Sequence, residues 1–138
     1  MTRRPRFRLL SAVLAVVLLP VSACSSSRAT RCEEAFTSAA TSVPGVASAK
    51  WDCDFGFGGG WVRGDVVLEV TTEDEAITVI EAVLRAFAES PDLEDSWSTP
   101  QKYTTEDPSI VFSAKDVGFA AGVPNVGEVR ERYGITPG

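Results

Sequence analysis

The stretch TEDEAITVIEAVLRAFAE, residues 72–89, carries the clearest structural signal in the chain. Apolar residues recur at helical spacing along one face of it: Ile77, Ile80, Leu84 and Phe87. Polar residues occupy the opposite face: Thr78, Glu81, Arg85 and Glu89. Thr72 and Glu75 have the spacing of a capping box, and Pro91 lies just beyond the last apolar residue. The segment therefore predicts an amphipathic helix that packs one face against a core.

Two stretches ahead of this helix alternate between apolar and polar residues. In the first, the apolar positions are Ala47, Ala49, Trp51, Cys53 and Phe55. In the second, the inward positions are Val62, Gly64, Val66, Leu68 and Val70. A period of two is typical of a half-buried strand. The glycine-rich residues 56–60 between them predict the turn of an antiparallel hairpin.

The remaining elements follow from shorter signals. Thr30 and Glu33 have capping-box spacing, which predicts a first helix from there to about Ser42. Residues 110–112 predict a strand, and residues 96–105 are expected to pair with it as an edge strand because they contain a proline, with the turn at Asp107 and Pro108. A last short helix is expected between Asn125 and Gly134.

This order, α-β-β-α-β-β-α, predicts an α+β fold. We expect an antiparallel sheet of about four strands with the helices packed on one of its faces. The length of 138 residues suits one domain with one core.

The N-terminus has the pattern of an export signal. MTRRPRFR contains four arginines and no acidic residue, and residues 9–23 are almost wholly apolar. A basic segment, a short apolar segment and small residues before a processing point are typical of a secretory signal peptide. The apolar run is short for a transmembrane helix, which needs about 18–20 such residues.

Val21-Ser22-Ala23-Cys24 resembles the lipobox of bacterial lipoproteins. The resemblance implies cleavage before Cys24, a diacylglyceryl group on its sulfur and an acyl chain such as palmitate. It predicts a signal peptide at residues 1–23 and a lipid anchor on Cys24. The serine-rich composition of residues 24–30 predicts a flexible tether, and the remaining residues, 31–138, are expected to form a single domain. The protein would lie on the extracytoplasmic face of the cell membrane, with membrane lipid as one partner. The alternative is a plain secreted protein with an incidental cysteine.

Composition narrows the classes of partner. Removing residues 1–23 takes away four of the 13 basic residues and none of the 19 acidic ones, so the net charge of the remainder is about −10. This charge argues against nucleic acid as a partner. An envelope protein or polymer remains compatible with it, and the acidic surface also serves solubility.

The chain contains no histidine, which excludes the catalytic triads and the zinc sites that depend on that side chain. We expect neither an enzyme nor a cofactor. After export, Cys32 and Cys53 are the remaining thiols, and both fall on apolar faces of their elements. Two such cysteines in an oxidising compartment predict a disulfide between the first helix and the first strand.

Two motifs resemble ligand sites only superficially. FGFGGGW, residues 55–61, lacks the following helix and the Lys-Ser/Thr pair of a phosphate loop. Asp52 and Asp54 begin like a calcium loop, but Arg63 stands where a bidentate glutamate is required. We interpret the first motif as a hairpin turn and the second as a solvated strand face, and we expect no metal site.

Function remains open among three hypotheses: a non-catalytic binding domain, an accessory module of a membrane complex, and a hydrolase that uses Asp or Glu on an envelope substrate. Phe57 in the turn and Trp61 on the outward strand face are the candidate partner-binding residues. The competing interpretation is that the segment around Phe119 folds over both rings and buries them.

Overall fold

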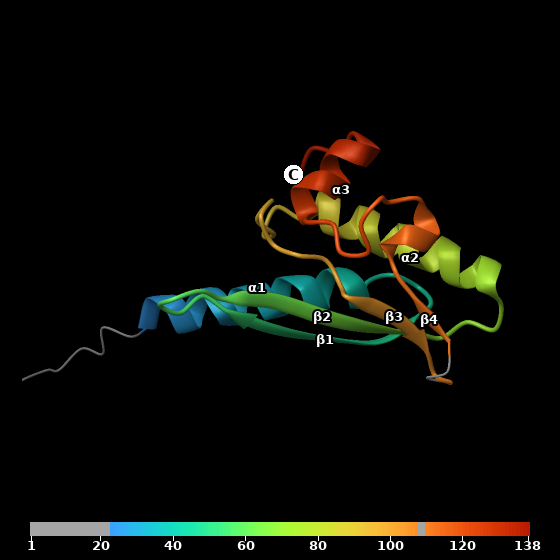
Figure 1. Ribbon diagram of the computed structural model, residues 1–138, viewed down its shortest axis with the longest axis horizontal. Coiled ribbons are helices and arrows are strands. Elements are labelled where there is room, and N and C mark those ends of the chain that lie inside the picture. Colours follow the sequence, from blue (N-terminus) through green and yellow to red (C-terminus); the bar gives the residue numbers. More distant parts are fainter. Residues whose placement is uncertain (1–22, 108–109) are drawn as a thin grey trace, which may run out of the picture.

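The structure is a computed structural model that describes residues 23–107 and 110–138. Its elements, shown in Figure 1, are α1 (Ala23–Thr41), β1 (Val46–Asp54), β2 (Trp61–Leu68), α2 (Glu73–Glu89), β3 (Lys102–Thr105), β4 (Val111–Phe112), the 3₁₀ helix η1 (Ala114–Val117) and α3 (Val126–Tyr133). The α+β class and the predicted order of helices and strands are confirmed, and η1 is the one addition.

The sheet is mixed rather than wholly antiparallel. Its strand order is β1-β2-β3-β4, with antiparallel β1/β2 and β3/β4 pairs and a parallel β2/β3 pair. The parallel pair arises because α2 carries the chain back before β3 begins. The expectation that this segment forms an edge was wrong, since Pro100 precedes β3 and needs no ladder hydrogen bond. The predicted turn at Asp107 and Pro108 lies partly outside the described residues.

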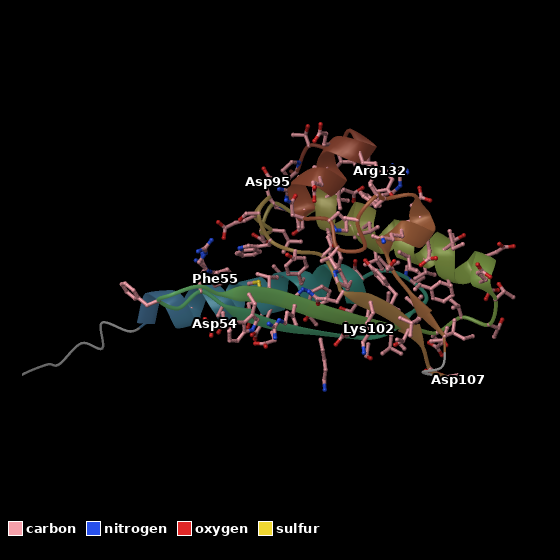
Figure 2. All side chains as sticks on the ribbon, viewed as in Figure 1. Asp54, Phe55, Asp95, Lys102, Asp107 and Arg132 are labelled. Carbon is pink, nitrogen blue, oxygen red and sulfur yellow. A yellow bond between two sulfur atoms is a disulfide. The ribbon has the colours of Figure 1, made fainter. Side chains whose placement is uncertain are left out.

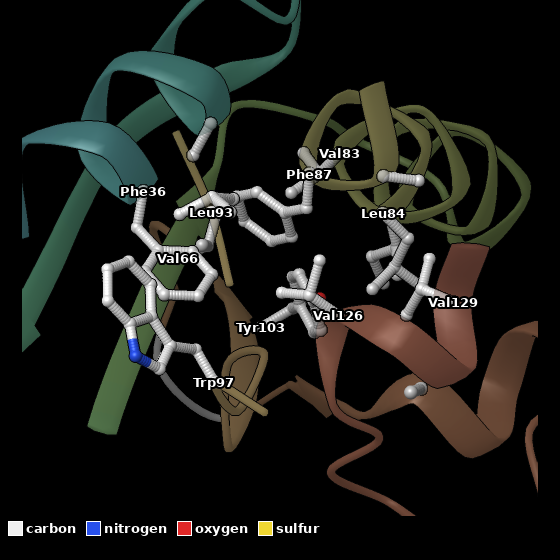
Figure 3. Packing of buried hydrophobic residues seen from close by; sticks show 14 of the residues in the cluster. Phe36, Val66, Val83, Leu84, Phe87, Leu93, Trp97, Tyr103, Val126 and Val129 are labelled. Atoms are coloured by element: carbon white, nitrogen blue, oxygen red, sulfur yellow. The ribbon is translucent and has the colours of Figure 1, made fainter. Parts of the chain in front are cut away.

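The helices cover one face of the sheet, and an aromatic cluster joins them to it. The Phe36 ring of α1 stacks on Trp51 of β1 with centroids 4.7 Å apart. Phe87 of α2 meets both rings edge-on, at 5.1 Å from Phe36 and 5.6 Å from Trp51. Figure 3 shows Phe36, Phe87 and Trp97 converging in this core. A side chain at Gly64, the strand partner of Trp51, would collide with the Trp51 ring, so this pair depends on glycine.

The N-caps expected at the starts of α2 and α3 are present, and the full capping box is formed at α3. The Thr72 hydroxyl accepts a hydrogen bond from the Glu75 backbone N–H. The Glu75 carboxylate accepts one from the Thr71 backbone N–H, and this bond lowers the pKa of Glu75. Asn125 and Glu128 cap α3 reciprocally at 2.8 and 2.7 Å. These local contacts explain why both helix starts were predictable from sequence.

The start of α1 differs from the sequence-based expectation. No helix begins at Thr30, because α1 already runs from Ala23, and residues 24–30 belong to the helix rather than to a flexible tether. The side chain of Arg28 supports this extra length by a bidentate ion pair with Glu94, at 2.9–3.1 Å. Residues 1–22, which carry nearly all of the predicted signal peptide, lie outside the described residues.

The predicted disulfide is present. Cys32 of α1 and Cys53 of β1 are bonded, with their Cα atoms 6.3 Å apart, and both side chains are buried (Figure 2). The Glu33 carboxylate accepts a hydrogen bond from the Cys53 backbone N–H at 3.1 Å, next to the bridge. The N-terminal half of α1 is therefore fixed to the end of β1 that leads into the hairpin turn.

Candidate functional site

The candidate site is the turn between β1 and β2, residues 55–61, which we call the hairpin tip. The strands pair as far as Asp54 and Trp61, and the Asp54 carboxylate accepts a hydrogen bond from the Gly56 backbone N–H at 2.8 Å. Gly58 and Gly59 adopt positive φ angles of 86° and 121°, which glycine tolerates without strain. A strand, not a helix, follows the tip, so the hairpin interpretation is confirmed over the phosphate loop.

Phe57 is fully exposed at the apex of the tip. Its relative accessibility is 112%, and a side chain at either Gly58 or Gly59 would meet no atom within 4 Å. The alternative that the segment around Phe119 buries Phe57 was wrong, because Phe119 packs on Tyr133 with centroids 6.0 Å apart. The fold therefore gains no burial energy from this aromatic ring, which leaves it free for contact with another surface.

Trp61 lies on the outward face of the sheet, as the alternation predicted, and is 41% exposed. Its indole N–H donates to the Asp52 carboxylate at 2.8 Å, and the Arg63 guanidinium lies 5.0 Å from the ring centroid. These contacts hold the ring in one orientation while a large part of its surface remains accessible. Asp52 is thus engaged as a hydrogen-bond acceptor for Trp61 on this solvated face.

The base of the tip is tied to α1 and to the loop after α2. The Arg28 guanidinium lies 4.2 Å from the Phe55 ring centroid, and Phe55 packs on Trp97 at 5.6 Å. A hollow of about 400 Å³ lies here, lined among others by Arg28, Phe55 and Trp61. Sequence reasoning missed Arg28, although its spacing of four from Cys32 and eight from Phe36 continues the buried stripe of the helix.

A second hollow, of about 680 Å³, lies between the start of α2 and the β3–β4 end of the sheet. Its acidic lining residues are Glu69, Glu73, Glu106, Asp107 and Asp116. The Asp116 carboxylate already accepts a hydrogen bond from the Ser113 backbone N–H, at 2.7 Å, within the cap of η1. These carboxylates are candidates for the hydrolase hypothesis, as are Glu34, Asp92 and Glu94, which line another hollow of about 630 Å³ beside α1. Over residues 23–107 and 110–138, no three potential ligands converge on a metal position.

Cys24, the predicted site of lipidation, belongs to the first turn of α1, and its side chain is outside the described part. Within the described residues, no helix has the length and apolarity needed to cross a membrane. Comparisons of the chain with protein-family models, curated proteins and solved structures give no match.

Proposed function

We propose that this protein is a lipid-anchored domain on the extracytoplasmic face of the cell membrane. It acts as a non-catalytic binding or accessory module, and the hairpin tip is its contact surface. The lipobox-like residues before Cys24 support the anchor. The exposure of Phe57 and Trp61 on a glycine-rich turn supports the contact surface. This exposure carries the proposal, because a soluble domain gains nothing by presenting two large aromatic rings to water.

The anchor is tested by replacing Cys24 with alanine. The variant lacks the sulfur that would carry the diacylglyceryl group, so we expect it to leave the membrane fraction or to accumulate as an uncleaved precursor. Fractionation of cells and mass spectrometry of the N-terminal peptide measure both outcomes. The matched control is the Cys32→Ala/Cys53→Ala variant, which also loses cysteines but should stay in the membrane fraction. A Cys24→Ala protein that is processed normally and stays membrane-bound contradicts the anchor.

The contact surface is tested by photo-crosslinking in intact cells. A photoreactive benzoylphenylalanine replaces Phe57 in one strain and Val111, which is 59% exposed on β4, in another. We expect a covalent adduct from position 57 and none from position 111, because only the tip is assigned a partner. Mass spectrometry identifies the adduct as protein, polymer or lipid. Equal yields from both positions, or no adduct at position 57, would overturn the assignment of the tip.

A further inference from the structure

The hairpin tip lies at the same end of the molecule as the residue that would carry the lipid. β1 runs toward the tip, and α1 runs away from it, with the two elements joined by the Cys32–Cys53 bridge. Figure 1 shows the first turns of α1 beside the free end of the β1–β2 hairpin. Arg28 contacts Phe55 directly, and the Cys24 backbone lies one helical turn, about 6 Å along the axis, before Arg28.

The helical start of α1 allows little relative movement between Cys24 and the hairpin tip. Because residues 24–30 are helical, an acyl group on Cys24 would hold the end of α1 itself at the membrane surface. The packing of the Arg28 guanidinium on the Phe55 ring and the disulfide keep this end of α1 against the hairpin, and the ion pair with Glu94 ties it to the loop after α2. An anchored domain would therefore bring the tip within reach of the same bilayer.

The chemistry of the tip suits a lipid surface. Residues 56–60 carry no charged side chain, and their apex presents the fully exposed Phe57 ring. Trp61 follows with its polar edge bonded to Asp52, and such amphipathic rings favour the boundary between headgroups and acyl chains. We propose that the hairpin tip inserts Phe57 into the lipid surface that holds the acylated Cys24, with Trp61 at the headgroup level.

This inference rests on the proposed lipid anchor and names the partner of the same contact surface. One aromatic ring contributes too little to hold an acidic domain at a membrane without an anchor. Once the acyl chains are in the bilayer, the anchor holds the tip at a high effective concentration beside the lipid surface. The Phe57 ring then has only to orient the domain. The tip therefore determines which face of the domain points away from the membrane, and not whether the protein is bound.

The test places a tryptophan reporter at the apex. The full chain is expressed with its leader in a bacterial host that processes lipoproteins, and carries Trp61→Phe to remove the native exposed indole. In this background, Phe57→Trp reports on the tip, and Val111→Trp reports on the opposite end. The purified proteins are reconstituted into phosphatidylcholine vesicles with or without bromine atoms on the acyl chains, which quench nearby indoles. Mass spectrometry of the N-terminal peptide records acylation independently.

We expect brominated chains to remove at least about half of the added emission of the Phe57→Trp protein, and to leave that of the Val111→Trp protein unchanged. If the protein is acylated but the indole at position 57 is not quenched, the insertion is overturned. The anchor is then retained, and the partner of the hairpin tip would be an envelope protein or polymer. Equal quenching at both positions also overturns the insertion, because the domain would then lie flat. If mass spectrometry finds no acyl group on Cys24 and the protein does not float with the vesicles, the lipid anchor is overturned, and the proposed insertion is overturned with it.

Discussion

Replacing Phe36 by alanine is expected to lower the free energy of unfolding by about 3–5 kcal/mol, the usual cost of removing a buried aromatic ring. Phe36 is fully buried, and its ring touches partners from three other segments: Trp51 in β1, Phe87 in α2 and Trp97 in the following loop. These segments surround the ring, so the cavity cannot close without moving a helix or the sheet. Urea unfolding followed by far-UV circular dichroism measures the change.

The matched control is Phe57→Ala, which removes the same atoms from an exposed site. This variant should stay within about 0.5 kcal/mol of the parent protein, because Phe57 contributes no buried surface. The pair therefore separates the fold from the proposed contact surface. A Phe36→Ala protein as stable as the Phe57→Ala protein would show that the aromatic cluster does not hold α1 on the sheet.

Removing the Cys32–Cys53 bridge in the double variant Cys32→Ala/Cys53→Ala is expected to cost about 3 kcal/mol, the chain-entropy value for a closed loop of this size. The two cysteines are 21 positions apart, and both lie in the core. Such a loss is a large share of the net stability of a small domain. The measurement is urea unfolding in a Cys24→Ser background, so that no third thiol exchanges with the bridge.

A reductant provides the control for this second prediction. Dithiothreitol should destabilise the protein that retains the bridge and leave the double variant unchanged. Alkylation of the unfolded, unreduced protein should label neither Cys32 nor Cys53. Two labelled cysteines, or a stability that does not respond to reductant, would mean that the thiols remain unpaired in solution.

Local sequence patterns predicted the helices and strands in which buried and exposed positions alternate with a regular period. The α2 helix shows a 3.6-residue period with a capping residue at its start, β2 shows a period of two, and β1 shows that period from Ala49 onward. Ala47, expected on the inward face, is exposed because the register of β1 shifts between Val46 and Ser48. Asn125 and Gly134 bound α3 because the capping contacts join residues only a few positions apart. The disulfide was predictable for a different reason: once Cys24 is set aside as the predicted site of lipidation, Cys32 and Cys53 are the remaining thiols of the chain.

Strand pairing between distant segments was not readable in the same way. The parallel pair of Val66 with Tyr103 joins residues on either side of α2, and no local period records which strand lies beside which. The proline at position 100 suggested an edge strand, yet β3 lies inside the sheet and starts just after it. The helical start of α1 was missed likewise, because its support comes from Glu94 and Phe55 far along the chain.

The candidate site also has features that the sequence pattern predicted and features that depend on the tertiary structure. The residue pattern alone placed Phe57 in a turn and Trp61 on an outward face, since both follow from alternation along one hairpin. Whether another segment covers these rings depends on the path of the chain beyond residue 113, and the packing of Phe119 on Tyr133 leaves them exposed. The meeting of the tip with the first turns of α1 likewise comes from folding, because burial of Phe36, Cys32 and Cys53 in one core brings these two distant segments together.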